Sequence, residues 1–163
     1  MIAKTIKYVN FNGENKEKTY YFHMNRIEFM ELETSVKGGW LENLQKKSEM
    51  VKKAVDEEEA NKKKLEAGET IPEGTGLASI DTVSVSAEFF DLIKDLVLRC
   101  VGEKSEDGED FVKDEALKKR FAHSEAFAIL LEEFFAKPES LSEFIQKAIP
   151  SAGAKELPAP SNN

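Results

Sequence analysis

The sequence predicts a mainly α-helical protein of the α+β class, in which an N-terminal β-hairpin precedes a compact helical bundle. Two stretches rich in aromatic and β-branched residues, 5–11 and 18–24, flank an Asn-Gly turn. Most later apolar residues recur at helical spacing. With 163 residues the chain is long enough for one domain with its own core. We therefore expect a single domain over residues 1–150, with a charged helical insertion at about 46–76 and a disordered tail at 151–163.

The hairpin turn is predicted at Asn12-Gly13, the strongest short turn dipeptide. After it, Asn25 and Glu28 have the spacing of a capping box, which predicts a helix from Arg26 toward Val36. Gly38-Gly39 is expected to end this helix, because two residues without a Cβ make a good C-cap and hinge.

The next helix is expected to be half-buried at its start and exposed at its end. Its apolar residues keep a three- and four-residue spacing from Leu41 to Val55, and the pattern then fails. Residues 46–66 hold seven lysines against six acids, a net charge of +1. This mixed composition is typical of a solvated helix face and not of a basic nucleic-acid patch.

A central core helix is predicted to begin at Ser86, with Phe89, Ile93, Leu96 and Val97 in its apolar stripe. Gly102 is expected to end it, and residues 107–112 to form a small hairpin or an ordered loop. The only cysteine, Cys100, lies among apolar residues and is expected to be a buried thiol, which fits a reducing cytosol.

The last third of the chain predicts short helices with many aromatic residues. Asp114 begins one that either kinks or breaks at Ser124, and Ser140 with Glu143 suggests a further start ahead of Pro150. Apolar stripes of this kind usually pack against each other, but the junction of two short helices can also leave them open to a partner. The candidate partner-binding residues are Phe134, Phe135, Phe144, Ile145 and Ile149.

Composition argues against several classes of function. The net charge of −8 disfavours binding to phosphate backbones and anionic membranes, and no apolar run approaches membrane-spanning length. The two histidines, His23 and His123, lack a ligand at metal-site spacing, so no metal or other cofactor is expected. No residue pattern predicts a catalytic site, so the protein is not expected to be an enzyme.

Three segments together resemble the tail assembly chaperones of long-tailed bacteriophages. They are the Asn-Phe-Asn-Gly turn at 10–13, the stretch VGEKSEDGEDFVK at 101–113 and the ending EFIQKAIP at 143–150. The sequence departs from the family pattern at Val101, where an aromatic residue is usual, and in the charged insertion.

The resemblance implies a small acidic helical protein of the host cytoplasm that is absent from the mature virion. Such chaperones bind the tape-measure protein, keep its helices soluble and give way to tail-tube proteins during assembly. A homo-oligomer and a longer frameshifted form are both compatible with the resemblance.

An alternative is an acidic helical adaptor or a DNA mimic that inhibits a host nuclease. Acids outnumber bases by 15 to 9 between residues 86 and 149, although interleaved lysines oppose such mimicry. Binding that weakens steeply with salt would favour the mimic, whereas apolar docking would change little.

Overall fold

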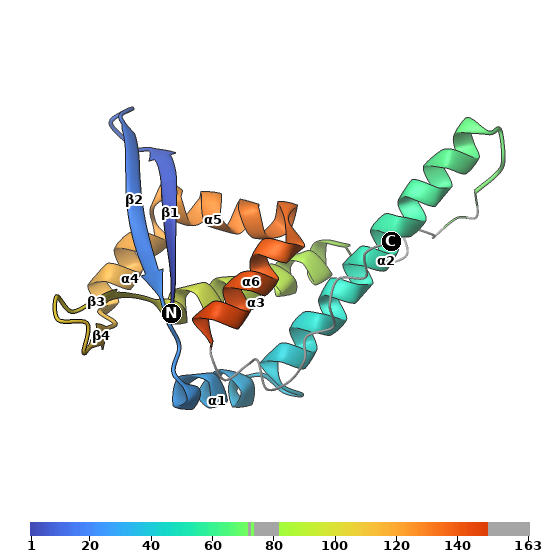
Figure 1. Ribbon diagram of the computed structural model, residues 1–163. Coiled ribbons are helices and arrows are strands. Elements are labelled where there is room, and N and C mark those ends of the chain that lie inside the picture. Colours follow the sequence, from blue (N-terminus) through green and yellow to red (C-terminus); the bar gives the residue numbers. More distant parts are fainter. Residues whose placement is uncertain (72, 74–81, 150–163) are drawn as a thin grey trace. The chain divides into compact units, whose positions relative to one another are not determined.

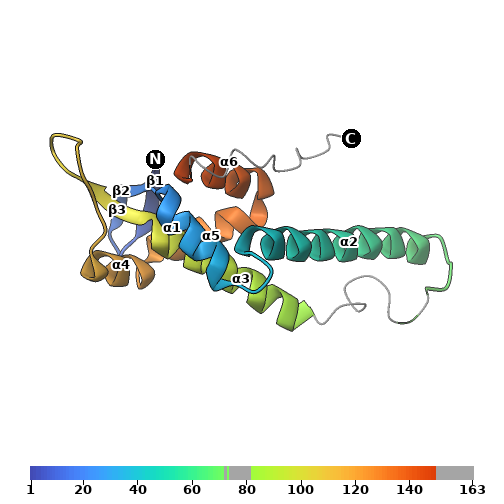
Figure 2. The same ribbon diagram turned by 90° about the horizontal axis from the view of Figure 1, so that it is seen from below.

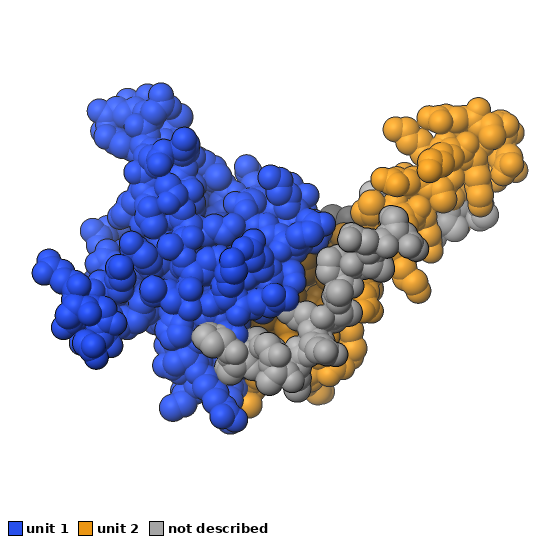
Figure 3. Space-filling view, in the orientation of Figure 1, with its two compact units in different colours: residues 1–31, 94–163 blue, residues 32–93 orange. Residues whose placement is uncertain are grey.

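The computed structural model describes residues 1–71, 73 and 82–149, with backbone only for 82–86. The fold is α+β, as predicted: an N-terminal hairpin is followed by helices (Figure 1). The chain forms two compact units, one from Met1–Glu31 with Lys94–Asn163 and the other from Leu32–Ile93 (Figure 3). That residues 1–150 behave as a single domain stays a prediction, and the expected tail at 151–163 and Pro150 lie outside the described residues.

The first unit contains an antiparallel four-stranded sheet of order β1-β2-β3-β4. Strands β1 (Ile2–Val9) and β2 (Asn15–Phe22) form the predicted hairpin, and both begin earlier in the sequence than expected. Gly13 has φ +78°, a conformation that residues with a Cβ rarely adopt, and this explains glycine in the turn. The Asn10 Oδ1 accepts hydrogen bonds from the Asn12 and Glu14 amides, which rigidifies the turn.

A second small hairpin, β3 (Val101–Lys104) with β4 (Phe111–Val112), confirms one of the two expectations for this segment. Gly102 does not act as a helix cap, because the helix ends at Cys100 and the chain enters β3 at once. A Cβ on Gly102 would lie 2.5 Å from a ring carbon of Phe111 and 2.7 Å from the Val112 carbonyl oxygen. Glycine is therefore needed here for close packing between the strands.

Helix α1 (Arg26–Ser35) has the predicted capping box. The Glu28 carboxylate accepts from the Asn25 amide at 2.8 Å, and the Asn25 side chain accepts from the Glu28 amide at 2.9 Å. Gly38 and Gly39 follow the helix, and both have a φ of 87°. This positive φ is incompatible with an α-helix, so the chain changes direction at the two glycines that were expected to end α1.

Helix α2 (Trp40–Glu66) belongs to the second unit and begins in its core. Trp40 is fully buried, and its indole N–H donates to the Leu92 carbonyl of helix α3 (Thr82–Cys100) at 3.1 Å. Lys47 pairs with Glu88 across the same two helices. Leu65, near the end of α2, is 61% exposed, so the expected fading of the buried face along this helix is confirmed.

The chain breaks into separate helices at Ser124. Helix α4 (Glu115–Ala122) begins at Asp114, whose side chain accepts from the Ala116 amide at 3.0 Å. Helix α5 (Glu125–Ala136) begins at Ser124, whose hydroxyl accepts from the Phe127 amide at 3.3 Å. Two cap residues ten positions apart therefore specify two helices and not one kinked helix.

The predicted start of the last helix at Ser140 is wrong. Helix α6 (Pro138–Ala148) begins two residues earlier, with proline in its first turn, where the missing N–H has no helical partner to lose. Ser140 lies inside the helix, and its hydroxyl contacts the Glu133 carboxylate.

The core of the first unit is a cluster of aromatic rings between the sheet and the helices. Phe22 of β2 is fully buried, with its ring centroid 5.7 Å from that of Phe121 and 5.2 Å from that of Phe144. Phe134 extends the cluster from α5, 5.0 Å from Phe144. Such edge and tilted contacts add to the free energy of burial. From the predicted central helix, Leu96 and Val97 of this unit are buried. Ile93, which is buried, and Phe89, which is half-buried, belong to the second unit.

Candidate partner-binding surfaces

The five predicted partner-binding residues fall into two groups in the structure. Four of them are buried, with exposed fractions of 0–2%: Phe134, Phe144, Ile145 and Ile149. Phe135 alone keeps substantial exposure, 42%. The spacing of apolar residues correctly predicted that these segments are helices. It does not predict which side of each helix is covered by another element.

The burial follows from how α5 and α6 pack against the hairpin. Helix α5 packs on β1, and α6 packs on both α5 and β1. The end of α6 is bonded to the residues that flank the hairpin strands: the Met24 amide donates to the Ala148 carbonyl at 2.9 Å, and the N-terminal ammonium donates to the Lys147 carbonyl at 2.9 Å. The N-terminus accordingly lies beside the end of α6 in both views (Figures 1 and 2).

A polar contact also joins the three elements. The Lys4 ammonium of β1 lies 2.9 Å from the Glu133 carboxylate of α5 and 3.2 Å from the Ser140 hydroxyl of α6. Burial alone would raise the pKa of Glu133, but the hydrogen bonds from Ser140 and Lys4 outweigh it and lower the pKa below its ordinary value. The carboxylate is therefore charged at neutral pH and holds α5, α6 and β1 together.

Helix α5 has one solvent-exposed face. Ala128, Glu132 and Phe135 are all exposed and follow one another at four- and three-residue spacing, so they lie on one side of the helix. The buried Phe127, Leu131 and Phe134 each directly precede one of these residues, so the buried stripe lies about 100° away around the helix. An exposed stripe with an aromatic residue at one end can accept the apolar face of another helix.

The β1–β2 hairpin has exposed apolar residues that the sequence analysis did not select. Val9 is 50% exposed and Phe11 81% exposed, and the hairpin end stands away from the helices of its unit (Figure 1). Helix α1 adds Ile27 and Met30, exposed by 70% and 58%. Their position in the sequence could have predicted this exposure, because residues in or beside the hairpin turn at 10–14 project beyond the sheet and have no core to enter.

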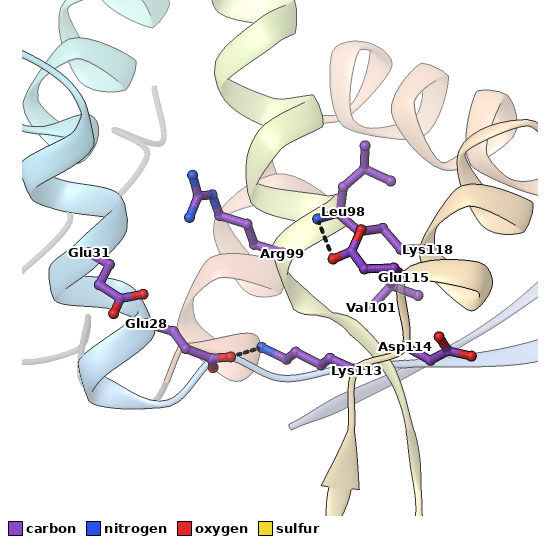
Figure 4. Close-up of a pocket in the computed structure, with 9 residues that line it drawn as sticks. All are labelled: Glu28, Glu31, Leu98, Arg99, Val101, Lys113, Asp114, Glu115 and Lys118. Carbon is purple, nitrogen blue, oxygen red and sulfur yellow. Dashed lines mark hydrogen bonds and ion pairs between the residues drawn. The ribbon is translucent and has the colours of Figure 1, made fainter.

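The first unit also has a small pocket between α1, the end of α3 and the start of α4 (Figure 4). Its charges are already paired: Lys113 lies 2.7 Å from Glu28, Lys118 lies 3.4 Å from Glu115, and Arg99 binds Asp95 at 2.9 Å. Because these acidic and basic side chains form ion pairs with one another, the pocket favours neither an anionic nor a cationic ligand.

Reactive groups are scarce in the part of the chain that the structure describes. Burial raises the pKa of the Cys100 thiol to about 12, so Cys100 is the predicted buried hydrophobe and not a nucleophile. The Nδ1 atom of His23 is buried without a hydrogen-bond partner, and burial lowers the pKa of this side chain. No cluster of metal-binding side chains and no helix long and apolar enough to cross a membrane occurs among these residues.

The fold and its surfaces define a small α+β protein whose conspicuous features are exposed apolar side chains, which points to binding of other proteins. The family of phage tail assembly chaperones matches residues 1–158, and the chain belongs to this family. The family predicted from the three segments is thus confirmed. No curated protein and no solved structure matches the chain.

Proposed function

We propose that this phage tail assembly chaperone binds the tape-measure protein, keeps it soluble and helps to recruit tail-tube proteins. It does so in the host cytoplasm without catalysis or a cofactor, and it is not retained in the mature virion. Membership of the chaperone family is the observation that carries the proposal. The exposed apolar residues of a charge-rich protein support it, because a chaperone for apolar helices needs surface that binds by burial.

The exposed face of α5 is the best candidate for the surface that binds the client. Phe135 provides an aromatic anchor, and such residues contribute most of the binding free energy in helix-binding surfaces. Ala128, about two helical turns away, lets a client helix approach closely because its side chain is small. Glu132 between them can pair with a lysine or arginine at the edge of the client helix.

The other four predicted residues support this surface from within. Phe134 and Phe144 pack ring to ring, and Ile145 and Ile149 fill the space around α6. Direct contact of these four residues with a partner stays a prediction, and it would require α6 to move away from α5 and β1. Replacing Phe144 and Ile149 by serine would therefore damage the fold and could not test binding.

The test is co-expression with the cognate tape-measure protein, followed by measurement of the soluble client. The intact chaperone is expected to keep the client soluble, and Phe135→Ser to lose most of this effect. Leu65→Ser is the matched control, because Leu65 is an exposed apolar residue on α2 in the other unit. Circular dichroism must show that both variants are folded.

Two outcomes would contradict the proposal at different levels. If the intact chaperone leaves the client insoluble, the proposed function is wrong. If Phe135→Ser works as well as the intact protein, the function stands and the client binds elsewhere.

A further inference from the structure

We infer that the free edge of strand β1 is a second docking surface, which binds an extended acidic segment of a partner protein as an added β-strand. This surface is separate from the helix-binding face of α5. The inference does not depend on the client proposed above, because it rests on the backbone, the charge and the exposed apolar residues of the hairpin.

The hydrogen-bond pattern shows which residues of β1 point outward. The Asn10 amide donates to the Glu14 carbonyl at 2.9 Å, so in this antiparallel ladder even-numbered residues of β1 bond to β2. The other side of β2 agrees, since the His23 amide donates to the Cys100 carbonyl at 2.8 Å and Tyr21 pairs with Gly102. Odd-numbered residues of β1 therefore direct their N–H and C=O groups away from the sheet: Ala3, Thr5, Lys7 and Val9.

These four outward residues have no backbone hydrogen-bond partner in the described part of the chain, and all four are exposed. β1 is the terminal strand of the sheet (Figure 1). At eight residues it is also long for an unprotected edge, which proteins usually keep short or covered. A row of free donors and acceptors with this spacing matches an extended chain and cannot pair with the backbone of a helix.

The charge of the hairpin selects for an acidic strand. Residues 1–24 contain four lysines and two glutamates, a net charge of +2, whereas the whole chain carries −8 and its remainder therefore −10. The Lys7 side chain is 81% exposed and pairs with Glu17 at 3.3 Å, and Lys16 is 48% exposed and pairs with Glu14 at 2.9 Å. Exposed pairs of this kind contribute little, so the lysines can turn to carboxylates on an incoming strand.

Apolar surface lies at the same end of the edge. Val9 is 50% exposed on β1, and Phe11 is 81% exposed in the turn that follows. An added strand with alternating acidic and apolar residues can therefore bury side chains here while its backbone pairs with β1. Like charge makes the lysine-bearing edge of a second copy a poorer occupant than an acidic strand.

The test uses the full chain and a synthetic eight-residue peptide of alternating glutamate and valine with blocked ends. Titration followed by amide chemical shifts is expected to move the signals of Ala3, Thr5, Lys7 and Val9 first. Amide hydrogen exchange at Thr5 and Lys7 should slow when the peptide is present. A peptide with lysine in place of glutamate serves as the charge control and should not bind.

The matched variants are Thr5→Pro and Thr5→Ala. Both lose the hydroxyl that lies 2.8 Å from Thr19, but only proline removes the outward N–H, and proline is tolerated on edge strands where that group faces solvent. Thr5→Pro should weaken peptide binding about tenfold relative to Thr5→Ala, the effect of losing one backbone hydrogen bond.

Several results would overturn the inference. They are equal binding by the two variants, equal binding of the lysine peptide, shifts confined to another surface, or self-association of the chain through β1. If Thr5→Pro does not fold, the exchange rates at Thr5 and Lys7 in the unaltered chain decide the matter.

Discussion

Replacing Phe144 by alanine tests whether the α5–α6 junction is core or an open partner-binding surface. Phe144 is 0% exposed, and its ring lies 5.2 Å from that of Phe22 and 5.0 Å from that of Phe134. Deleting a buried phenylalanine side chain costs about 3–5 kcal/mol, through lost burial and the cavity that remains. Each lost ring pair accounts for roughly 0.5–1.5 kcal/mol beyond area burial. We expect a destabilisation near the upper end of that range.

The assays are urea unfolding and thermal melting of the intact chain and the variant, both followed by circular dichroism. For a protein of this size, each kcal/mol lowers the melting temperature by about 2–4 °C, so a loss of about 5 kcal/mol should make Phe144→Ala melt roughly 10–20 °C lower. Phe135→Ala is the control, because the same residue type is 42% exposed on the neighbouring helix and should lose much less stability. If both variants lose the same small amount, Phe144 is not in the core and the packing described above is wrong.

Three further changes test other parts of the fold. Leu96→Ala, at a residue with 0% exposure in α3, should destabilise by about 2–5 kcal/mol in the same assay, and a loss below about 1 kcal/mol would argue against a central core helix. Gly102→Ala should open the β3–β4 hairpin, because its Cβ would meet Phe111 at 2.5 Å; unchanged amide exchange in β3 would contradict this. Glu133 has a lowered pKa when folded, so its stabilisation is present above its unfolded pKa and is lost as pH falls through the folded pKa. In Glu133→Gln the free energy of unfolding should therefore fall less steeply as the pH is lowered. An unchanged dependence on acid pH would show that other carboxylates dominate it.

Local signals in the sequence predicted most of the elements, because each signal acts through a few neighbouring residues. Asn12-Gly13 specifies a tight turn, and Asn25 with Glu28 satisfies helix N–H groups, whatever surrounds them. Ser140 with Glu143 has the same spacing but does not form a cap. Pro138 starts the helix earlier, and the Ser140 side chain bonds a distant carboxylate. A capping pattern fails where a stronger local signal precedes it.

The exposure of the candidate partner-binding residues was harder to predict, because it depends on contacts between elements that are distant in sequence. Phe134 and Phe135 are adjacent in the chain, yet one is 1% and the other 42% exposed. Helical period separates them onto different faces, but only the position of β1 and α6 decides which face is covered. The free edge of β1 likewise depends on where the other strands pair, which no single segment of the sequence specifies.

The hydrogen bond from the Met24 amide to the Ala148 carbonyl joins residues near opposite ends of the first unit, so it can form only late in synthesis. The hairpin leaves the ribosome before the helices, but Phe22 receives the ring of Phe144 only after helix α6 has been made. At about 5–20 residues per second, translation of the intervening chain takes on the order of 10 s. During that interval the newborn hairpin exposes both its strand edges and its apolar face. This tail assembly chaperone thus itself passes through a stage of synthesis in which its own apolar surface is unprotected.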